Sequence, residues 1–288
     1  MAGGFAVNEE SYPVVVTRDY FKHYIKGAVG WHWHDAMEFA VVLSGDVDFY
    51  VNETSISLHG GEGVFINTGS LHQAVIHDDM GEAAMFSITV PKEAIAPKDT
   101  FIYQKYVSTV LEDKSLCGFA LRPDCDWQKP LLSKLNSIYA LASHPCFAYE
   151  MQLQILINDA WYQLLLQRER LCKTAAPSLE KEKSEQRIKA MLTYIQENYA
   201  MELTIQDIAD SAGISKSECF RCFQNVVHKK PVTYVNEYRI DRAMHLLETT
   251  KLSVAEVCHL CGFHHESYFG KWFRRATGLT PLQYKKRF

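Results

Sequence analysis

TIQDIADSAGI (residues 204–214) and SVAEVCHLCGF (residues 253–263) are two copies of one segment, separated by 49 positions. Within each copy, apolar residues recur at the three- and four-residue spacing of a helix face. A glycine then follows, Gly213 or Gly262, and glycine can adopt the positive φ that ends a helix and turns the chain. The repeat therefore predicts a helical unit that occurs twice.

Both copies begin with a capping box, formed by Thr204 with Asp207 and by Ser253 with Glu256. In this motif a hydroxyl accepts from free backbone amides, and an acid lies near the positive end of the helix. A second short helix is expected after each glycine, with its apolar residues packed against the first helix. A capped helix, a tight turn and a second helix form a helix-turn-helix.

The second copy continues as GFHHESYFGKWFRRATGLTPLQY (residues 262–284). This stretch closely resembles the signature of the AraC/XylS family of transcription regulators. The resemblance covers residues 186–288 and extends to the helix expected over residues 231–248, which joins the two units. It implies a protein that binds specific sequences of double-stranded DNA through two helix-turn-helix motifs.

In a helix-turn-helix the second helix enters the major groove, and exposed residues near its start meet base edges. Arg221 is the best candidate, because a guanidinium can form two parallel hydrogen bonds with guanine. After one inserted residue the repeat runs at an offset of 50, so Lys271 is its counterpart. The predicted DNA-binding residues are Ser217, Glu218, Phe220 and Arg221 in the first unit, and His265, Glu266, Ser267, Lys271, Arg274 and Arg275 in the second.

Charge is distributed unevenly along the chain. The net charge is −4, yet residues 185–288 contain 15 lysines and arginines against 11 acidic residues. A basic region joined to an acidic one is typical of a protein that attracts phosphate with one part only. Lys285 is among the expected phosphate contacts. Arg239 and Arg242 either clamp acidic groups, such as Asp241 or the capping acids, or contact phosphate, and the structural role is preferred.

The N-terminal half has a different pattern. Residues 11–90 contain short β-rich runs, such as 39–43 and 47–51, separated by glycine and polar turns. Short strands at close spacing predict a small barrel. Two stretches with helical apolar spacing, residues 127–142 and 147–171, predict helices that cover it.

Two segments of this half, HWHDAMEFAVVLSG (residues 32–45) and NTGSLH (residues 67–72), resemble the paired motifs of cupin barrels. Asn67 departs from that pattern, because proline is usual there. If the first strand is continuous, alternation brings His32, His34 and Glu38 to one face, and His72 joins them from a neighbouring strand. Three imidazoles and one carboxylate suit zinc, manganese, iron or nickel. Alternatively, the pocket binds an organic effector, or the histidines only form hydrogen bonds inside the barrel.

Aromatic residues flank the first histidine of this motif. Flat apolar rings beside polar imidazoles favour a ligand with stackable faces, such as a sugar. Regulators of the resembled family often control carbohydrate use, and this also favours a sugar. A core role for one tryptophan is the alternative. The predicted effector-binding residues are Trp31, His32, Trp33, His34, Glu38 and His72, and the predicted metal ligands are His32, His34, Glu38 and His72.

The length of 288 residues allows two domains. We expect an α+β protein with a cupin-like β-barrel and helices over residues 1–171, a linker over 172–185, and an all-α DNA-binding domain over 186–288. In the resembled family, helices of the first domain often form the dimer interface. A homodimer is therefore expected.

Cysteines at Cys219, Cys222, Cys258 and Cys261 have the spacing of two half zinc sites. Each pair, however, falls inside a predicted helix at positions that are apolar or small in the other copy. Core packing is therefore the preferred interpretation. The sequence shows neither a signal peptide nor a long apolar span, so a cytoplasmic protein without membrane contact is expected.

The expected function is that of a transcription regulator without enzymatic activity, controlled by a small molecule bound in the barrel and requiring no cofactor. Activation and repression are both compatible with the sequence, and an activator would also contact RNA polymerase. Two other functions remain open. The protein could be a cupin metalloenzyme, or a regulator whose barrel binds a protein partner.

Overall fold

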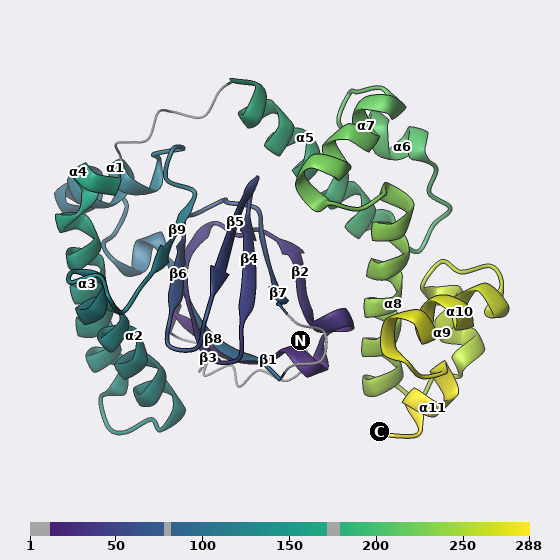
Figure 1. Ribbon diagram of the computed structural model, residues 1–288, viewed down its shortest axis with the longest axis horizontal. Coiled ribbons are helices and arrows are strands. Elements are labelled where there is room, and N and C mark those ends of the chain that lie inside the picture. Colours follow the sequence, from purple (N-terminus) through teal and green to yellow (C-terminus); the bar gives the residue numbers. More distant parts are fainter. Residues whose placement is uncertain (1–11, 78–81, 172–178) are drawn as a thin grey trace. The chain divides into compact units, whose positions relative to one another are not determined.

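A computed structural model describes residues 12–77, 82–171 and 179–288. The chain divides into two compact units, and the division falls between Pro177 and Ser178 (Figure 1). Residues 172–178 of the expected linker lie outside the described residues, and residues 179–185 form the first part of a helix. In the described part of the chain, no helix combines the length and apolar character that a bilayer crossing requires.

The strands of the first unit form two antiparallel sheets. One sheet has the order β1 (Val15–Tyr20), β8 (Ala84–Pro91), β3 (Ala36–Ser44), β6 (Gly63–Ile66) and β9 (Gly118–Leu121). The other has the order β2 (Ala28–His32), β7 (His72–Ile76), β4 (Val47–Val51) and β5 (Thr54–Leu58). Among the described strands, no hydrogen-bonded pairing joins the two sheets. The expected closed barrel is therefore an open, cupin-like sandwich.

Alternation along β3 divides the interior of this unit into two cores. Phe39 and Val41 belong to the core on the helical side of the five-stranded sheet, together with residues of α2 (Gln128–Ser143) and α3 (Tyr149–Leu166). Ala40 and Val42 belong to a second core, which contains residues of both sheets. The two expected helices are thus present. The second ends at Leu166, before the short α4 (Arg168–Leu171), and α1 (Ser108–Leu111) lies earlier in the chain.

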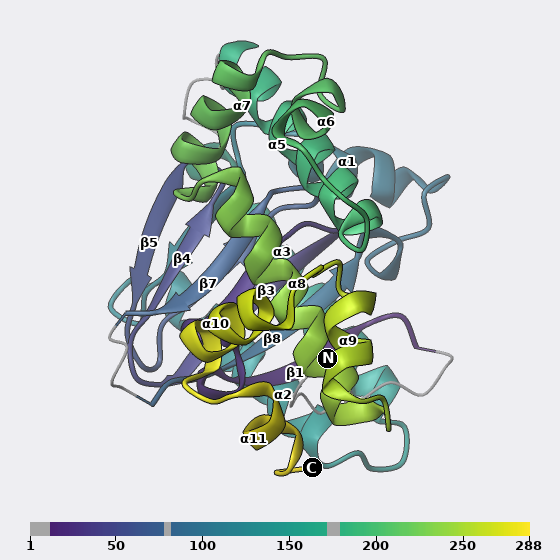
Figure 2. The ribbon, with the colours of Figure 1, turned by 90° about the vertical axis from the view of Figure 1, so that its right-hand side faces the viewer.

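The second unit is helical throughout (Figure 2). Its helices are α5 (Leu179–Asn198), α6 (Ile205–Asp210), α7 (Lys216–Cys222), α8 (Pro231–Thr249), α9 (Val254–Leu260), α10 (Glu266–Thr277) and α11 (Pro281–Lys285). Helices α6 and α7 form the first helix-turn-helix, and α9 and α10 form the second. Both predicted capping boxes are formed, and α7 continues as a π-helical turn over Phe223–Val227. The four cysteines of this unit are buried, which agrees with core packing.

Arg239 on α8 connects the two helix-turn-helix units. Its Nε donates to the carbonyl of Tyr199 at 2.7 Å, and its Nη2 donates to the carbonyl of Met201 at 2.8 Å. The guanidinium carbon also lies 5.6 Å from the centre of the Phe263 ring. The role is structural, as expected, but the partners are carbonyl groups rather than Asp241 or the capping acids.

The two corner glycines differ in the space around them. Both have a positive φ, +63° at Gly213 and +77° at Gly262. A methyl group at Gly213 would meet no atom of the described residues within 4 Å, whereas one at Gly262 would lie 2.6 Å from the carbonyl oxygen of Tyr199. The second corner is therefore tightly packed against the chain that follows α5.

We predict that Gly262→Ala destabilises the helical unit more than Gly213→Ala. Both substitutions place a side chain in the left-handed region, which costs about 1–2 kcal/mol. Only Gly262→Ala adds a steric overlap, and overpacking costs about 1–3 kcal/mol more. Urea unfolding followed by far-ultraviolet circular dichroism measures both free energies. Equal losses in the two variants would contradict the packing described for the second corner.

Candidate functional site

The four side chains of the predicted cluster do lie together, but they are not brought together by one continuous strand. His32 ends β2, His34 lies in the connection to β3, Glu38 lies on β3, and His72 begins β7. Strands β2 and β3 belong to different sheets, so the expectation of one continuous strand is wrong. The chain crosses between the sheets at residues 33–35. His72 is the cross-strand partner of His32, as expected from a neighbouring strand.

Main-chain carbonyls fix the orientation of the three imidazoles. In each case Nδ1 is hydrogen-bonded to a carbonyl two residues away, at 2.8 Å from His32 to Gly30, 2.9 Å from His34 to Ala36 and 2.8 Å from His72 to Ser70. A carbonyl oxygen can only accept, so Nδ1 carries the proton in all three rings. A neutral imidazole then has its lone pair on Nε2. Histidines that bind metals are commonly oriented in this way.

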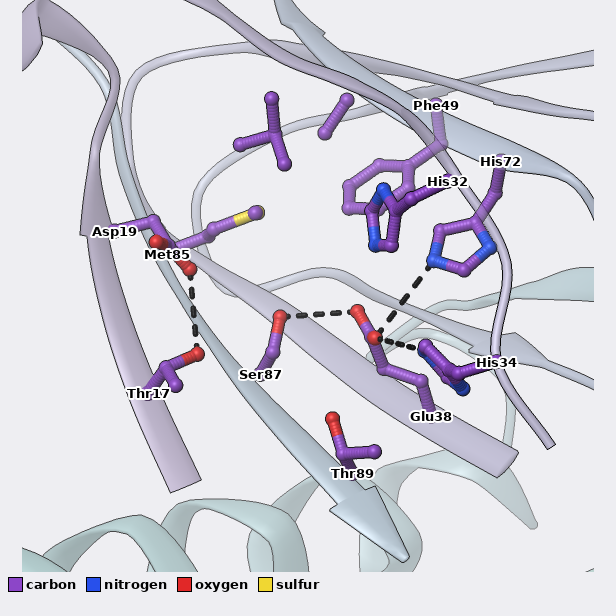
Figure 3. A pocket seen from close by; sticks show the side chains of 12 residues that line it. Thr17, Asp19, His32, His34, Glu38, Phe49, His72, Met85, Ser87 and Thr89 are labelled. Atoms are coloured by element: carbon purple, nitrogen blue, oxygen red, sulfur yellow. Dashed lines mark hydrogen bonds and ion pairs between the residues drawn. The ribbon is translucent and has the colours of Figure 1, made fainter. Parts of the chain in front are cut away.

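The Nε2 atoms converge on the Glu38 carboxylate (Figure 3). Its Oε2 lies 3.1 Å from Nε2 of His34 and 3.7 Å from Nε2 of His72. The possible ligand atoms of all four residues lie within 4.8 Å of one another. Nε2 of His72 is buried and has no hydrogen-bond partner among the residues that the structure describes. Facing acceptors of this kind require a proton or a metal cation between them.

Burial and mutual contact shift the acid–base behaviour of these groups. Burial and the neighbouring His72 lower the pKa of His32 to about 4, so this ring is neutral at pH 7. Burial opposes the charged form of His34, but its hydrogen bond to Glu38 raises its pKa above the usual value. Burial would raise the pKa of Glu38, but its hydrogen bond to His34 and the close approach of His72 hold it well below its usual range. Glu38 is therefore a carboxylate at neutral pH.

The cluster forms one side of a cavity of about 200 Å³. Beside the cluster the lining is polar, with Ser87 and Thr89 on β8 and Thr17 and Asp19 on β1. The Ser87 hydroxyl donates to Oε1 of Glu38 at 3.0 Å (Figure 3). Asp19 accepts from the Tyr24 hydroxyl, and burial raises the pKa of its carboxyl group. The prediction from sequence missed these four residues. Alternation along β1 and β8 places them on one face, but the sequence does not show that this face lines a cavity.

The remaining lining residues are apolar, namely Val29, Phe49, Ala74 and Met85. Trp31 and Trp33, which we expected to bind the effector, do not line the cavity. Trp31 is only 4% exposed, and its ring lies 6.3 Å from that of Tyr50, so it has the alternative core role. Phe49 provides the aromatic face instead.

Asn67 takes no part in the cavity. Its side-chain amide donates to the carbonyls of Val110 and Leu111, at 3.3 and 3.4 Å. Its side-chain oxygen accepts from the backbone amide of Thr68. The departure from the cupin pattern at this position therefore has a structural role away from the imidazole cluster.

In the helical unit, the predicted DNA-binding side chains lie on or beside α7 and α10. Arg221 is 69% exposed, and the predicted second-unit residues are exposed as well. His265 immediately precedes α10 as its N-cap residue. Arg275 lies over the Trp272 ring, 5.4 Å from its centre.

Two charged side chains expected to contact DNA have partners within the protein. Glu218 is only 22% exposed, and its carboxylate accepts from Arg187 and Arg221. The ammonium group of Lys285 donates to the carbonyls of Lys251 and Leu252. Glu218 and Lys285 are therefore held by contacts inside the protein. Arg274 is the better candidate for a phosphate contact.

Comparison with known proteins agrees with this architecture. A family model described as a helix-turn-helix domain matches residues 208–287, and one described as a cupin domain matches residues 23–89. The uncharacterized HTH-type transcriptional regulator YdeC of Bacillus subtilis is 31% identical over 278 residues, covering 95% of this chain and 92% of its own. The chain belongs to the AraC/XylS family of transcription regulators.

Other members of the AraC/XylS family are similar over most of their length. The melibiose operon regulatory protein of Escherichia coli is 25% identical, covering 88% of this chain and 83% of its own. ToxT from Vibrio cholerae has a TM-score of 0.48 at 12% identity, covering 96% of this chain and 98% of its own. The helix-turn-helix and cupin matches and the similarity to YdeC identify this AraC-family protein as a DNA-binding transcription regulator with a cupin-like domain.

Proposed function

We propose that this regulator binds operator DNA under the control of a neutral, polyhydroxylated effector, a carbohydrate, held in the cavity of the cupin-like domain. The observation that carries the proposal is the charge of the cavity lining. The carboxyl groups of Asp19 and Glu38 both face the cavity, and no lysine or arginine is among the described residues that line it.

In the cavity without a bound cation, an anionic effector would meet these carboxyl groups without a cationic partner, which is unfavourable in a buried site. Sugar hydroxyls, in contrast, can donate to Asp19 and exchange hydrogen bonds with Thr17, Ser87 and Thr89. The Phe49 ring offers a flat apolar surface for the C–H face of a sugar ring. Carboxylates, hydroxyls and one aromatic face together match a neutral sugar.

Cavity size and one relative support the same class. The volume of about 200 Å³ is below the range of about 300–1,000 Å³ that holds drug-sized ligands. This favours a monosaccharide over a larger molecule. The relative named for the melibiose operon is a regulator of genes for a sugar. Relatives named as transcription regulators also favour control of DNA binding over catalysis by a cupin metalloenzyme.

We also propose that His32, His34, Glu38 and His72 can hold one divalent cation, although DNA binding does not require it. A tetrahedral site with bonds of about 2.1 Å places its ligand atoms about 3.4 Å apart. The separations of 3.1 and 3.7 Å from the Glu38 carboxylate are close to this value. Three Nε2 lone pairs and one carboxylate suit zinc and similar transition metals.

A further part of the proposal is homodimerisation through α3. Four large apolar side chains on this helix are 54–69% exposed, namely Met151, Ile155, Tyr162 and Leu166. At 3.6 residues per turn these positions fall within about 60° of one another around the helix axis. A second copy of the same helix, packed antiparallel, presents a matching apolar stripe. As an activator, the dimer would also contact RNA polymerase.

Binding of neutral sugars is expected to raise the melting temperature of the full-length protein. A ligand at 100 times its dissociation constant stabilises the folded state by about 2.7 kcal/mol. We would compare galactose with galacturonate and glucose with glucuronate, because each pair differs only at one carbon. The neutral member should bind, the acid should not, and Asp19→Asn should weaken binding. Asp48→Asn, a carboxylate on the other face of β4, serves as the matched control.

Failure of every sugar to stabilise the protein would contradict a carbohydrate effector, and equal binding of the acids would contradict the charge argument. Operator binding measured in parallel should change when the active sugar is added. It should also weaken steeply with salt, because each neutralised phosphate contributes about −0.9 to the logarithmic slope.

Metal binding is predicted at a stoichiometry of one ion per chain. Equilibrium dialysis against Zn²⁺, with metal content measured by atomic emission, tests this number. His72→Ala should abolish binding because it removes a ligand that no neighbour can replace. His59→Ala changes a histidine that is paired with Asp46 outside the cavity and should keep the ion. Equal metal content in both variants would rule out the cluster as the site.

Dimerisation through α3 predicts that Ile155→Lys yields a monomer in sedimentation velocity, because it places a charge within the apolar stripe. Ile155 is exposed, so the monomer itself should remain folded. Gln152→Lys adds the same charge at an exposed position outside the stripe and should remain dimeric. A dimer in both variants would place the interface elsewhere.

A further inference from the structure

Glu218 on α7 links the base-reading helix of the first unit to α5. Its Oε1 lies 3.2 Å from Nη1 of Arg187 on α5 and 2.7 Å from Nη2 of Arg221 on α7. One carboxylate oxygen thus accepts from both guanidinium groups. Helices α5 and α7 lie side by side in both views of the ribbon (Figures 1 and 2).

The second unit has an equivalent connection with different chemistry. Asn236 on α8 stands 49 positions after Arg187, and Tyr268 on α10 stands 50 positions after Glu218. The Asn236 amide lies 3.3 Å from the Tyr268 hydroxyl. The repeat therefore includes the helix that precedes each unit. In the first unit this connection is ionic, and it continues to the predicted base-reading residue Arg221, three residues after Glu218. In the second unit the residue three positions before Lys271 is Tyr268, which is not an acid.

We propose that Arg187 and Glu218 are positioning residues that orient Arg221 toward its base, so that the sequence preference of the first unit depends on α5. This inference rests on the predicted base contact of Arg221. A guanidinium has five N–H donors, and Glu218 occupies one nitrogen of Arg221 from one side. The opposite edge remains available for two parallel bonds to guanine.

The physical reason for such an arrangement is the flexibility of arginine. The Arg221 side chain is 69% exposed, and a free arginine loses rotamer entropy when it docks against a base. Glu218 restricts that freedom before DNA arrives. Arg187 holds the same carboxylate oxygen from a neighbouring helix and so adds a restraint on Glu218.

Selection of bound sequences from randomised DNA, read by deep sequencing, tests the inference and does not require the operator to be identified first. A bidentate contact discriminates by about 1–3 kcal/mol, which is roughly 5- to 150-fold. Arg221→Ala should abolish the preference at one base position. Glu218→Gln and Arg187→Ala should each reduce it at that same position, by about threefold or more. In the double variant, Arg187→Ala should add little to Glu218→Gln, because both act through one contact.

The second unit is the internal control of this experiment. The base preferences of the second unit should stay unchanged in every first-unit variant, and this result would also show that the fold is intact. Lys271→Ala should alter the preferences of the second unit and leave those of the first unchanged. The slope of affinity against salt should also stay constant in Arg187→Ala, because a phosphate contact would instead lower it by about 0.9.

Three outcomes would overturn the inference. A preference that is unchanged or sharper in Arg187→Ala would show that Arg187 does not position Arg221. A uniform loss at all base positions would assign Arg187 to phosphate or to general stability. If Arg221→Ala has no effect, Arg221 makes no base contact and the positioning role is wrong as well. That result would leave the proposed effector control of the protein unaffected.

Discussion

Arg239 joins the two helix-turn-helix units by donating two hydrogen bonds from α8 to the chain that leaves α5. Hydrogen bonds to charged groups contribute about 1.5–3 kcal/mol each. A side chain at Gly262 would overlap the Tyr199 carbonyl that Arg239 binds and would lie 3.0 Å from Nη2 of Arg239, so this contact and the second corner depend on each other. With this contact in place, the 19 residues of α8, about 28 Å of helix, set the spacing between the two base-reading helices. The placement of the two helices predicted to read bases therefore depends on a contact within the protein.

Much of the helical unit could be predicted from the sequence because its signals are local. The hydroxyl and acid of each capping box stand three residues apart, and the corner glycines follow at a fixed distance, so no distant contact is needed to identify them. The partners of charged side chains are not local. Glu218 and Lys285 occupy positions that suggest DNA contacts, yet Arg187 from α5 and the carbonyls of Lys251 and Leu252 engage them. A helical wheel shows which way a side chain points, but not what the next helix presents to it.

The cupin-like unit was harder to predict for a related reason. The motif residues His32, His34, Glu38 and His72 meet as expected, although the chain changes sheets between the first and third of them. Alternation is a rule for one strand and cannot reveal such a crossing. The rest of the polar lining, including Asp19, carries no motif, because its position depends on β1 pairing with β8 more than 60 residues later. The prediction for Trp31 and Trp33 relied on their proximity in sequence to His32. That proximity does not place their side chains on the face that carries His32.

The two sheets share no hydrogen-bonded edge among the described strands, and this has a mechanical consequence. His32 and His72 stand on one sheet, whereas Glu38 and Asp19 stand on the other. Any ion or sugar held between them would therefore add a cross-link between the two layers. Occupancy would restrict shear between the layers and suppress the breathing of the sandwich as a whole. A stiffness change of this kind can be passed to neighbouring segments without any hinge or large displacement.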